Sequence, residues 1–159
     1  MGAKWDEIDL AGKMWKVPPG RMKAGKEHRV ALSQRALELL RKLPTEKSNE
    51  FVFIGSRPDT GLSAASLTQT LRRMGCGDIS VHGFRGTFRD WAAEQTNFPH
   101  EVAELALAHR VGSKTERAYL RADLLRKRFA LAEAWTKYCD TPPTAGDGTV
   151  VPIRKRAAP

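Results

Sequence analysis

The spacing of apolar residues changes near Ser33, and this change constrains the fold more than any other feature of the chain. Before Ser33, apolar and polar residues alternate in three short runs, 5–10, 14–17 and 28–32, which is the spacing of half-buried strands. After it, apolar residues recur every three to four positions, which is typical of amphipathic helices. The sequence therefore predicts an α+β fold that is mainly α, with a small antiparallel three-stranded sheet near the N-terminus.

Caps and helix breakers set the expected helix boundaries. Ser33 is a typical N-cap, so we expect a helix from there to Leu43, and we expect residues 51–54 to form a short buried strand or an extended segment. Residues 114–119 are expected to form a short helix or a turn. The other expected helices run from a Ser63 cap to Gly75, along a stripe of Phe84, Phe88, Trp91 and Ala92, from Pro99 to about Ala108, and from about Asp123 to Tyr138 with Leu125, Phe129, Ala132 and Trp135 on one face.

Length and composition favour a single domain. A chain of 159 residues with 41% hydrophobic content can bury one core but is too short for two. The end of the chain is rich in Pro, Gly, Thr and basic residues and has little apolar content. We therefore expect one domain over residues 1–139 and a disordered basic tail over residues 140–159.

The charge balance favours a polyanionic partner. Lys and Arg number 27 against 18 Asp and Glu, which gives a net charge of +9, and this excess suits either nucleic acid or an acidic membrane surface. No apolar run approaches the ~20 residues that span a bilayer, and the N-terminus lacks the apolar core of a secretory signal. Two cysteines, Cys76 and Cys139, are too few for a disulfide framework. We expect a cytoplasmic protein that binds nucleic acid and has no membrane partner.

Four residues, His82, Arg85, His109 and Tyr119, form a set that is suited to attack on a phosphodiester. Such attack needs a nucleophile, cationic donors for the non-bridging oxygens and a proton donor for the leaving oxygen. Tyrosine can be the nucleophile, and the planar fork of arginine matches phosphate. Histidine or lysine can move the proton.

Each of these residues also has an ordinary structural interpretation. Tyr119 can be a core tyrosine, Arg85 a surface cation, and His109 a cation at a helix C-terminus. The segment from His100 to Glu104 resembles half of a zinc-protease helix, but glutamate stands where the second histidine belongs, so we expect no metal there. The joint pattern, with its neighbours, is what favours the phosphodiester interpretation.

That joint pattern resembles the catalytic domain of tyrosine recombinases, and most closely the integrases of prophages and genomic islands. The resemblance covers roughly residues 3–139, so it includes the expected sheet as well as the helices. The matching segments are His82-x-x-Arg85, Leu107-Ala108-His109, Ala118-Tyr119-x-Arg121, the strand that begins at Trp5, and the hairpin with Met22-Lys23 and residues 28–33.

The resemblance implies a role for each matching residue. Tyr119 would form a 3′-phosphotyrosyl bond and free a 5′-hydroxyl, while Arg85 clamps the scissile phosphate. His82 would assist proton transfer, His109 would hydrogen-bond the phosphate, and Lys23 would be the general acid for the 5′-oxygen. No cofactor or metal is implied, because the cationic side chains do that work. The implied partner is a double-stranded DNA attachment site.

The resemblance also bears on DNA contacts and assembly. Arg72, Arg73 and Arg121 are candidates for contacts with backbone phosphates. In this family the segment after the nucleophile often packs on a neighbouring chain, so the helix over residues 123–138 can pack in trans, giving a homo-oligomer, or in cis. A bacterial or phage gene is implied.

One departure from the family pattern concerns activity. The family places another arginine, in an Arg-x-x-Glu element, just before the strand that begins at Trp5, and residues 1–4 contain no arginine. Loss of a phosphate-binding arginine is expected to cost several powers of ten in rate, by analogy with ~10²–10³ for a lost oxyanion-hole donor. We therefore expect a folded domain with little or no recombinase activity alone. The alternatives are a non-catalytic DNA-binding remnant of a decayed prophage integrase and a type IB topoisomerase-like relaxer.

Overall fold

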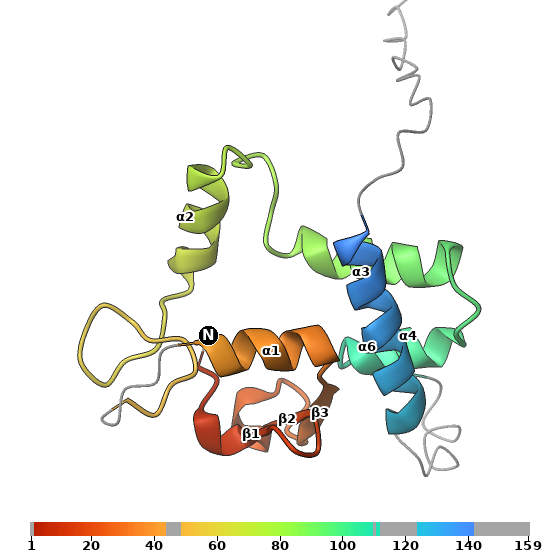
Figure 1. The fold of residues 1–159 in the computed structure, drawn as a ribbon, viewed down its shortest axis with the longest axis horizontal. Helices are drawn as coiled ribbons and strands as arrows, with labels where there is room; N and C mark the ends of the chain where they lie inside the picture. The colour runs from red at the N-terminus through yellow and green to blue at the C-terminus, as the bar shows by residue number, and fades with distance from the viewer. Residues whose placement is uncertain (1, 44–48, 110, 112–123, 142–159) are drawn as a thin grey trace, which may run out of the picture.

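The computed structural model describes residues 2–43, 49–109, 111 and 124–141. A small sheet lies at one end of the molecule, and the described helices lie above and beside it (Figure 1). The predicted α+β fold, mainly α with a three-stranded sheet, is confirmed. In chain order the elements are η1 (Trp5–Glu7), β1 (Ile8–Asp9), β2 (Met14–Val17), η2 (Pro19–Arg21), β3 (His28–Ala31), α1 (Gln34–Lys42), α2 (Ala65–Arg73), α3 (Gly83–Glu94), α4 (His100–Ala106) and α6 (Leu125–Asp140).

The sheet is an antiparallel meander in the order β1-β2-β3. Trp15 at its centre pairs with Ile8 on one side and Val30 on the other. The predicted strand over residues 14–17 is confirmed, and the third strand is one residue shorter than predicted. The predicted first strand is wrong in its first half, which is the 3₁₀ helix η1, because the Glu7 carboxylate turns back to accept the Lys4 backbone N–H at 3.2 Å.

The first helix follows the capping rule. The Ser33 hydroxyl accepts the backbone N–H of Ala36 at 3.2 Å, and Leu37 is buried beneath the helix. The helix ends one residue before the predicted Leu43. The segment 51–54 does not form a continuous strand: isolated bridges at Phe51 and Ile54 flank two bend residues, of which Val52 is buried and Phe53 exposed.

Helix α2 departs from its prediction at its start. It begins at Ala65, because the Ser63 hydroxyl contacts the Ser66 hydroxyl at 3.1 Å instead of capping a backbone N–H. Its end is as predicted, since Gly75 follows with a φ of +77°, which favours glycine. Leu67 and Met74 are exposed, so this apolar stripe does not reach the core. Figure 1 shows α2 standing apart from α3, α4 and α6.

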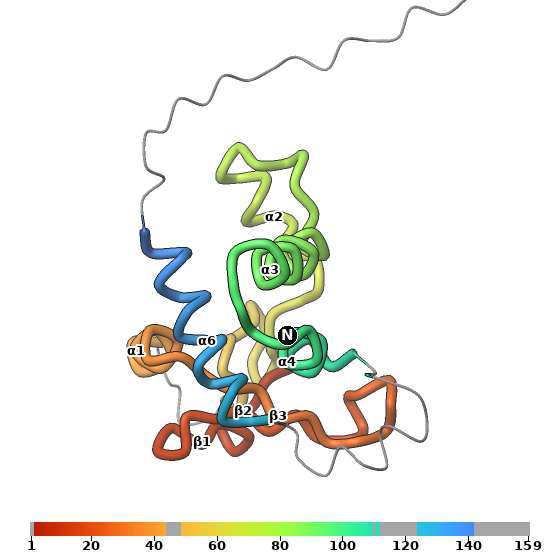
Figure 2. Tube along the Cα trace, turned by 90° about the vertical axis from the view of Figure 1, so that its right-hand side faces the viewer, coloured from red at the N-terminus to blue at the C-terminus, as the bar shows by residue number. Residues whose placement is uncertain are grey.

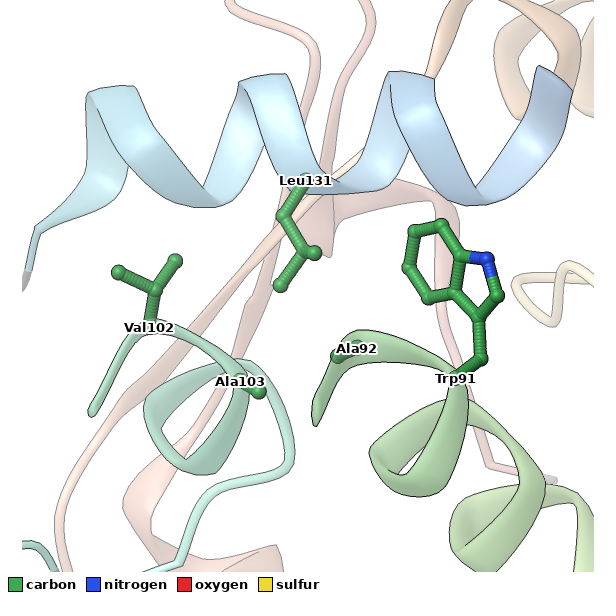
Figure 3. Packing of buried hydrophobic residues seen from close by; sticks show 5 residues of the cluster. All are labelled: Trp91, Ala92, Val102, Ala103 and Leu131. Atoms are coloured by element: carbon green, nitrogen blue, oxygen red, sulfur yellow. The ribbon is translucent and has the colours of Figure 1, made fainter. Parts of the chain in front are cut away.

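The main core lies where α3, α4 and α6 meet. Leu131 of α6 points between Ala92 of α3 and Val102 of α4 (Figure 3). Trp91 and Trp135 pack beside it, with ring centroids 5.0 Å apart and ring planes tilted by 59°. Two helix boundaries differ from expectation: α4 ends two residues early at Ala106, and α6 begins at Leu125. Two helix faces also differ, since Phe84 of α3 is exposed. The buried face of α6 carries Arg128 and Leu131, whereas Leu125, Phe129 and Ala132 are only half-buried.

Helix α6 joins the sheet region to the helical core within one chain, as Figure 2 shows from the side. Its Glu133 carboxylate accepts the backbone N–H of Gln34 at 2.8 Å, and Thr136 and Ser33 share a hydroxyl contact at 2.7 Å. The described part of this helix therefore packs in cis. The expectations for residues 114–119 and for the tail beyond 141 lie outside the described residues, and no described helix is long and apolar enough to cross a membrane.

Candidate functional site

The N-terminal end of α3 presents Arg85 to solvent. Phe88, Trp91 and Ala92 turn toward the core and so fix the rotation of the helix. Arg85 and Arg89 lie one turn apart on another face, because side chains at positions i and i+4 are neighbours. Arg85 lies in the first turn of the helix, where the residues are exposed.

The turn after α4 brings His109 to this face. Ala108 has a φ of +58°, and the His109 backbone N–H donates to the carbonyl of Glu104 at 2.9 Å. Arg85 Nη2 donates to the carbonyl oxygen of Leu107 at 2.6 Å and lies 2.8 Å from Nε2 of His109. Two predicted site residues that are 24 positions apart in the sequence therefore meet in the fold.

Arg89 and Glu104 also belong to this site, although the sequence analysis gave neither a functional role. Glu104 Oε1 accepts Arg89 Nε at 2.7 Å, and Glu104 Oε2 lies 2.8 Å from His109 Nδ1. His100 is farther away, with Nε2 3.8 Å from Oε1. The available signal was spacing: Glu104 lies five residues before His109 on a helix that faces two arginines one turn apart.

The electrostatics of the cluster keep the Glu104 carboxyl ionised. Burial raises the pKa of Glu104, but the hydrogen bonds from His109 and Arg89 and the charge of Arg89 lower it by more, so its net pKa lies below the ordinary value of 4.5. An ionised carboxylate is an acceptor only. The cluster thus runs Arg85, His109, Glu104, Arg89, with the carboxylate buried and the other three side chains exposed.

The remaining predicted residues are spread over the same molecule. His82 is the exposed residue that precedes α3, and Lys23 is exposed on the loop 18–27, which projects in Figure 2 to the same side as the end of α4. Among the described residues, neither side chain has a hydrogen-bond or ion-pair partner. Arg72 and Arg73 end α2 and are exposed. The positions predicted for the nucleophile and its neighbour, Tyr119 and Arg121, lie outside the described residues.

Comparison with known proteins connects this geometry to a family. The model of the phage integrase family matches residues 1–126, which include the sheet, α1 to α4 and the Arg85–His109 contact. The chain belongs to the phage integrase family. The resemblance to tyrosine recombinases noted in the sequence is thereby confirmed.

Three curated relatives illustrate the similarity. The chain is 35% identical to the prophage integrase IntA of Escherichia coli (strain K12), over 94% of this chain and 36% of that protein. It is 33% identical to the prophage integrase IntZ of the same strain, over 87% of this chain and 35% of that protein. It is 28% identical to the integrase of Enterobacteria phage P4, over 87% and 36% respectively. The chain thus spans about a third of the length of these integrases, and no solved structure matches it significantly.

Proposed function

We propose that this chain is the catalytic domain of a site-specific DNA recombinase, which cleaves and rejoins a double-stranded attachment site through a 3′-phosphotyrosyl intermediate. The observation that carries the proposal is the meeting of Arg85 with His109 at 2.8 Å on an exposed face. A guanidinium and an imidazole at one point can together hold the oxygens of one phosphate. Membership of the phage integrase family supports the assignment.

The guanidinium of Arg85 is suited to phosphate because two of its three nitrogens have no hydrogen-bond partner among the described residues. Its contacts with Leu107 and His109 both use Nη2. Within the described residues, Nη1 and Nε make no hydrogen bond, so each remains free to donate to a phosphate oxygen. The carbonyl of Leu107 holds the group in place while it binds.

The proposed reaction conserves the phosphodiester bond energy. The Tyr119 hydroxyl oxygen bonds to phosphorus as the bond from phosphorus to the 5′-oxygen breaks. The tyrosine proton leaves with the assistance of His82, and Lys23 gives a proton to the departing 5′-oxygen. Attack of a 5′-hydroxyl on the phosphotyrosine reverses these steps, so rejoining needs no ATP.

Binding of the rest of the duplex would use the basic surface. A net charge of +9 attracts a polyanion through counterion release, which makes the affinity salt-dependent. Arg72, Arg73 and Arg121 are our candidates for contacts with backbone phosphates, which position the duplex without reading its sequence. We place the protein in the cytoplasm. We also propose a homo-oligomer through the C-terminal helix; the described part of α6 packs on its own chain.

We also propose that residues 1–159 cleave DNA poorly by themselves. The family resemblance places a further phosphate-binding arginine, in an Arg-x-x-Glu element, directly before the strand that includes Trp5. Residues 2–4 supply Gly, Ala and Lys there. A longer polypeptide that carries such an element would complete the site.

A nicked suicide duplex that carries the attachment core tests the proposal. We expect a covalent protein–DNA adduct when an upstream segment with the Arg-x-x-Glu element precedes residue 1, little adduct from residues 1–159 alone, and none from Tyr119→Phe in the longer form. If the longer form gives no adduct but still shifts the duplex in a salt-sensitive way, the chain is a DNA-binding module and the enzymatic proposal fails.

A further inference from the structure

The contact between Arg85 and His109 ends a chain of polar side chains that begins in the protein interior. Arg89 donates to one oxygen of Glu104, and His109 approaches the other through Nδ1. The side chain of Glu104 is 12% exposed, whereas those of Arg89 and His109 are 53% and 41% exposed. The buried member is therefore the carboxylate, between two groups that face solvent.

The donors and acceptors in this chain are compatible with one neutral form of the imidazole. An ionised carboxylate accepts only, so His109 Nδ1 must carry the hydrogen at 2.8 Å from Glu104. Arginine donates only, so His109 Nε2 must present a lone pair to Arg85 at 2.8 Å. Both contacts are satisfied only by the neutral tautomer with the proton on Nδ1. Free histidine prefers the opposite tautomer.

We infer that Glu104 is a positioning residue that fixes His109 as the Nδ1–H tautomer and directs Nε2 to the place where Arg85 would bind phosphate. This inference deepens the proposed function and rests on it. Arg89 holds the carboxylate in turn, because its Nε bonds the oxygen that His109 does not use. A buried carboxylate behind a histidine plays the same part in hydrolytic triads, where it sets the tautomer and stabilises the imidazolium.

The arrangement also predicts what changes when a phosphate arrives. A phosphate oxygen replaces Nε2 as the acceptor for Arg85, and the ring stays in place because Glu104 still accepts its Nδ1–H. Arg85 and Glu104 contact the imidazole, while Arg89 and His100 contact Glu104. Glu104 is the anionic member of this set, so it is the group that accepts from the imidazole.

The tautomer of His109 tests this inference directly and without DNA. We would record long-range ¹H–¹⁵N spectra of the histidine rings in the full chain, with His109→Gln to identify the signal. The expected result is Nδ1–H in the unaltered chain and in Glu94→Ala, which removes an exposed carboxylate of α3. Nδ1–H should also persist in Arg85→Ala, where Glu104 alone constrains the ring, and change to Nε2–H in the double variant Arg85→Ala/Glu104→Ala. An Nε2–H signal in the unaltered chain or in Arg85→Ala, or an Nδ1–H signal in the double variant, would overturn the inference.

A kinetic arm separates positioning from folding. In the longer form with the upstream segment, Glu104→Ala should slow adduct formation about 10–100-fold, the usual range for a group that orients a histidine from behind, while Glu94→Ala leaves it unchanged. Equal rates in both variants would contradict the inference. Failure of the unaltered longer form to make adduct would instead reject the proposed function, and the tautomer spectra would still decide the state of His109.

Discussion

Two partly buried carboxylates, Glu7 near the sheet and Glu104 in α4, have nearly the same surroundings and serve different ends. Their side chains are 11% and 12% exposed, and each accepts an arginine and a ring N–H. In both, burial raises the pKa but the hydrogen bonds received lower it by more, so both net pKa values lie below 4.5.

The difference between them lies in what their partners touch next. Glu7 binds Trp15, the Lys4 backbone N–H and Arg21, and these contacts hold η1 against the sheet. The partners of Glu104 lead outward, through His109, to the exposed Arg85. A buried carboxylate that accepts an arginine and a ring N–H therefore stabilises the packing of η1 on the sheet in one place. In the other place it supports a candidate site on the helices.

The arginine at the outer end of the Glu104 cluster should give the largest difference. Arg85→Ala should lower the rate of adduct formation in the longer form by about 10²–10³, because a donor to the developing phosphate charge is lost. Arg21→Ala is the matched control, since it removes an arginine from the Glu7 cluster. Adduct formation on the suicide duplex measures both rates. A similar loss of rate in the two variants would show that the Glu104 cluster has no special part in cleavage.

For stability we expect the opposite order, with the larger effect at the Glu7 cluster: Glu7→Ala should lower the unfolding free energy more than Glu104→Ala. Glu7→Ala leaves the half-buried Trp15 Nε1–H without its acceptor, which costs about 1–3 kcal/mol of unfolding free energy. Glu104→Ala should cost less, because water can reach Arg89 and His109 in the folded protein. Urea denaturation of both variants provides the measurement. A greater loss in Glu104→Ala would show that this carboxylate is the main structural tie.

Acid should weaken both clusters, with a smaller effect. Since each folded pKa is lowered, the stabilisation is fully present above the unfolded value of about 4.5 and is lost as the pH falls through the folded pKa. Glu7→Gln and Glu104→Gln should each flatten the fall in unfolding free energy below pH 4.5. Urea midpoints across that range test this, and an unchanged slope in either variant would count against an ionised carboxylate there.

Local signals in the sequence were enough for much of the fold. The alternation at residues 14–17 and the cap at Ser33 gave correct elements because the neighbours of each residue decide them. Alternation misled at η1, where Glu7 turns back to bond a backbone N–H three residues earlier. The buried face of α6 was also misjudged, because the sequence does not distinguish Leu131 from Leu125 until the partner helices are placed.

The candidate site was predictable in its parts and not in its assembly. Motif resemblance singled out Arg85 and His109, but their contact depends on how α3 packs against α4. Glu104 was passed over because a glutamate on a helix usually faces solvent, and only the packing of Arg89 and His109 around it reveals its burial. The roles of Tyr119, Lys23 and His82 remain predictions.

The most direct measurement is the position of the covalent bond in the trapped adduct. The longer form would be reacted with the nicked duplex, digested with protease and nuclease, and sequenced by mass spectrometry. We predict one nucleotide-bearing peptide, modified at Tyr119 through a 3′-phosphate, and its loss in Arg85→Ala under the same conditions. An adduct at another residue, or one that persists in Tyr119→Phe, would contradict the proposed active site.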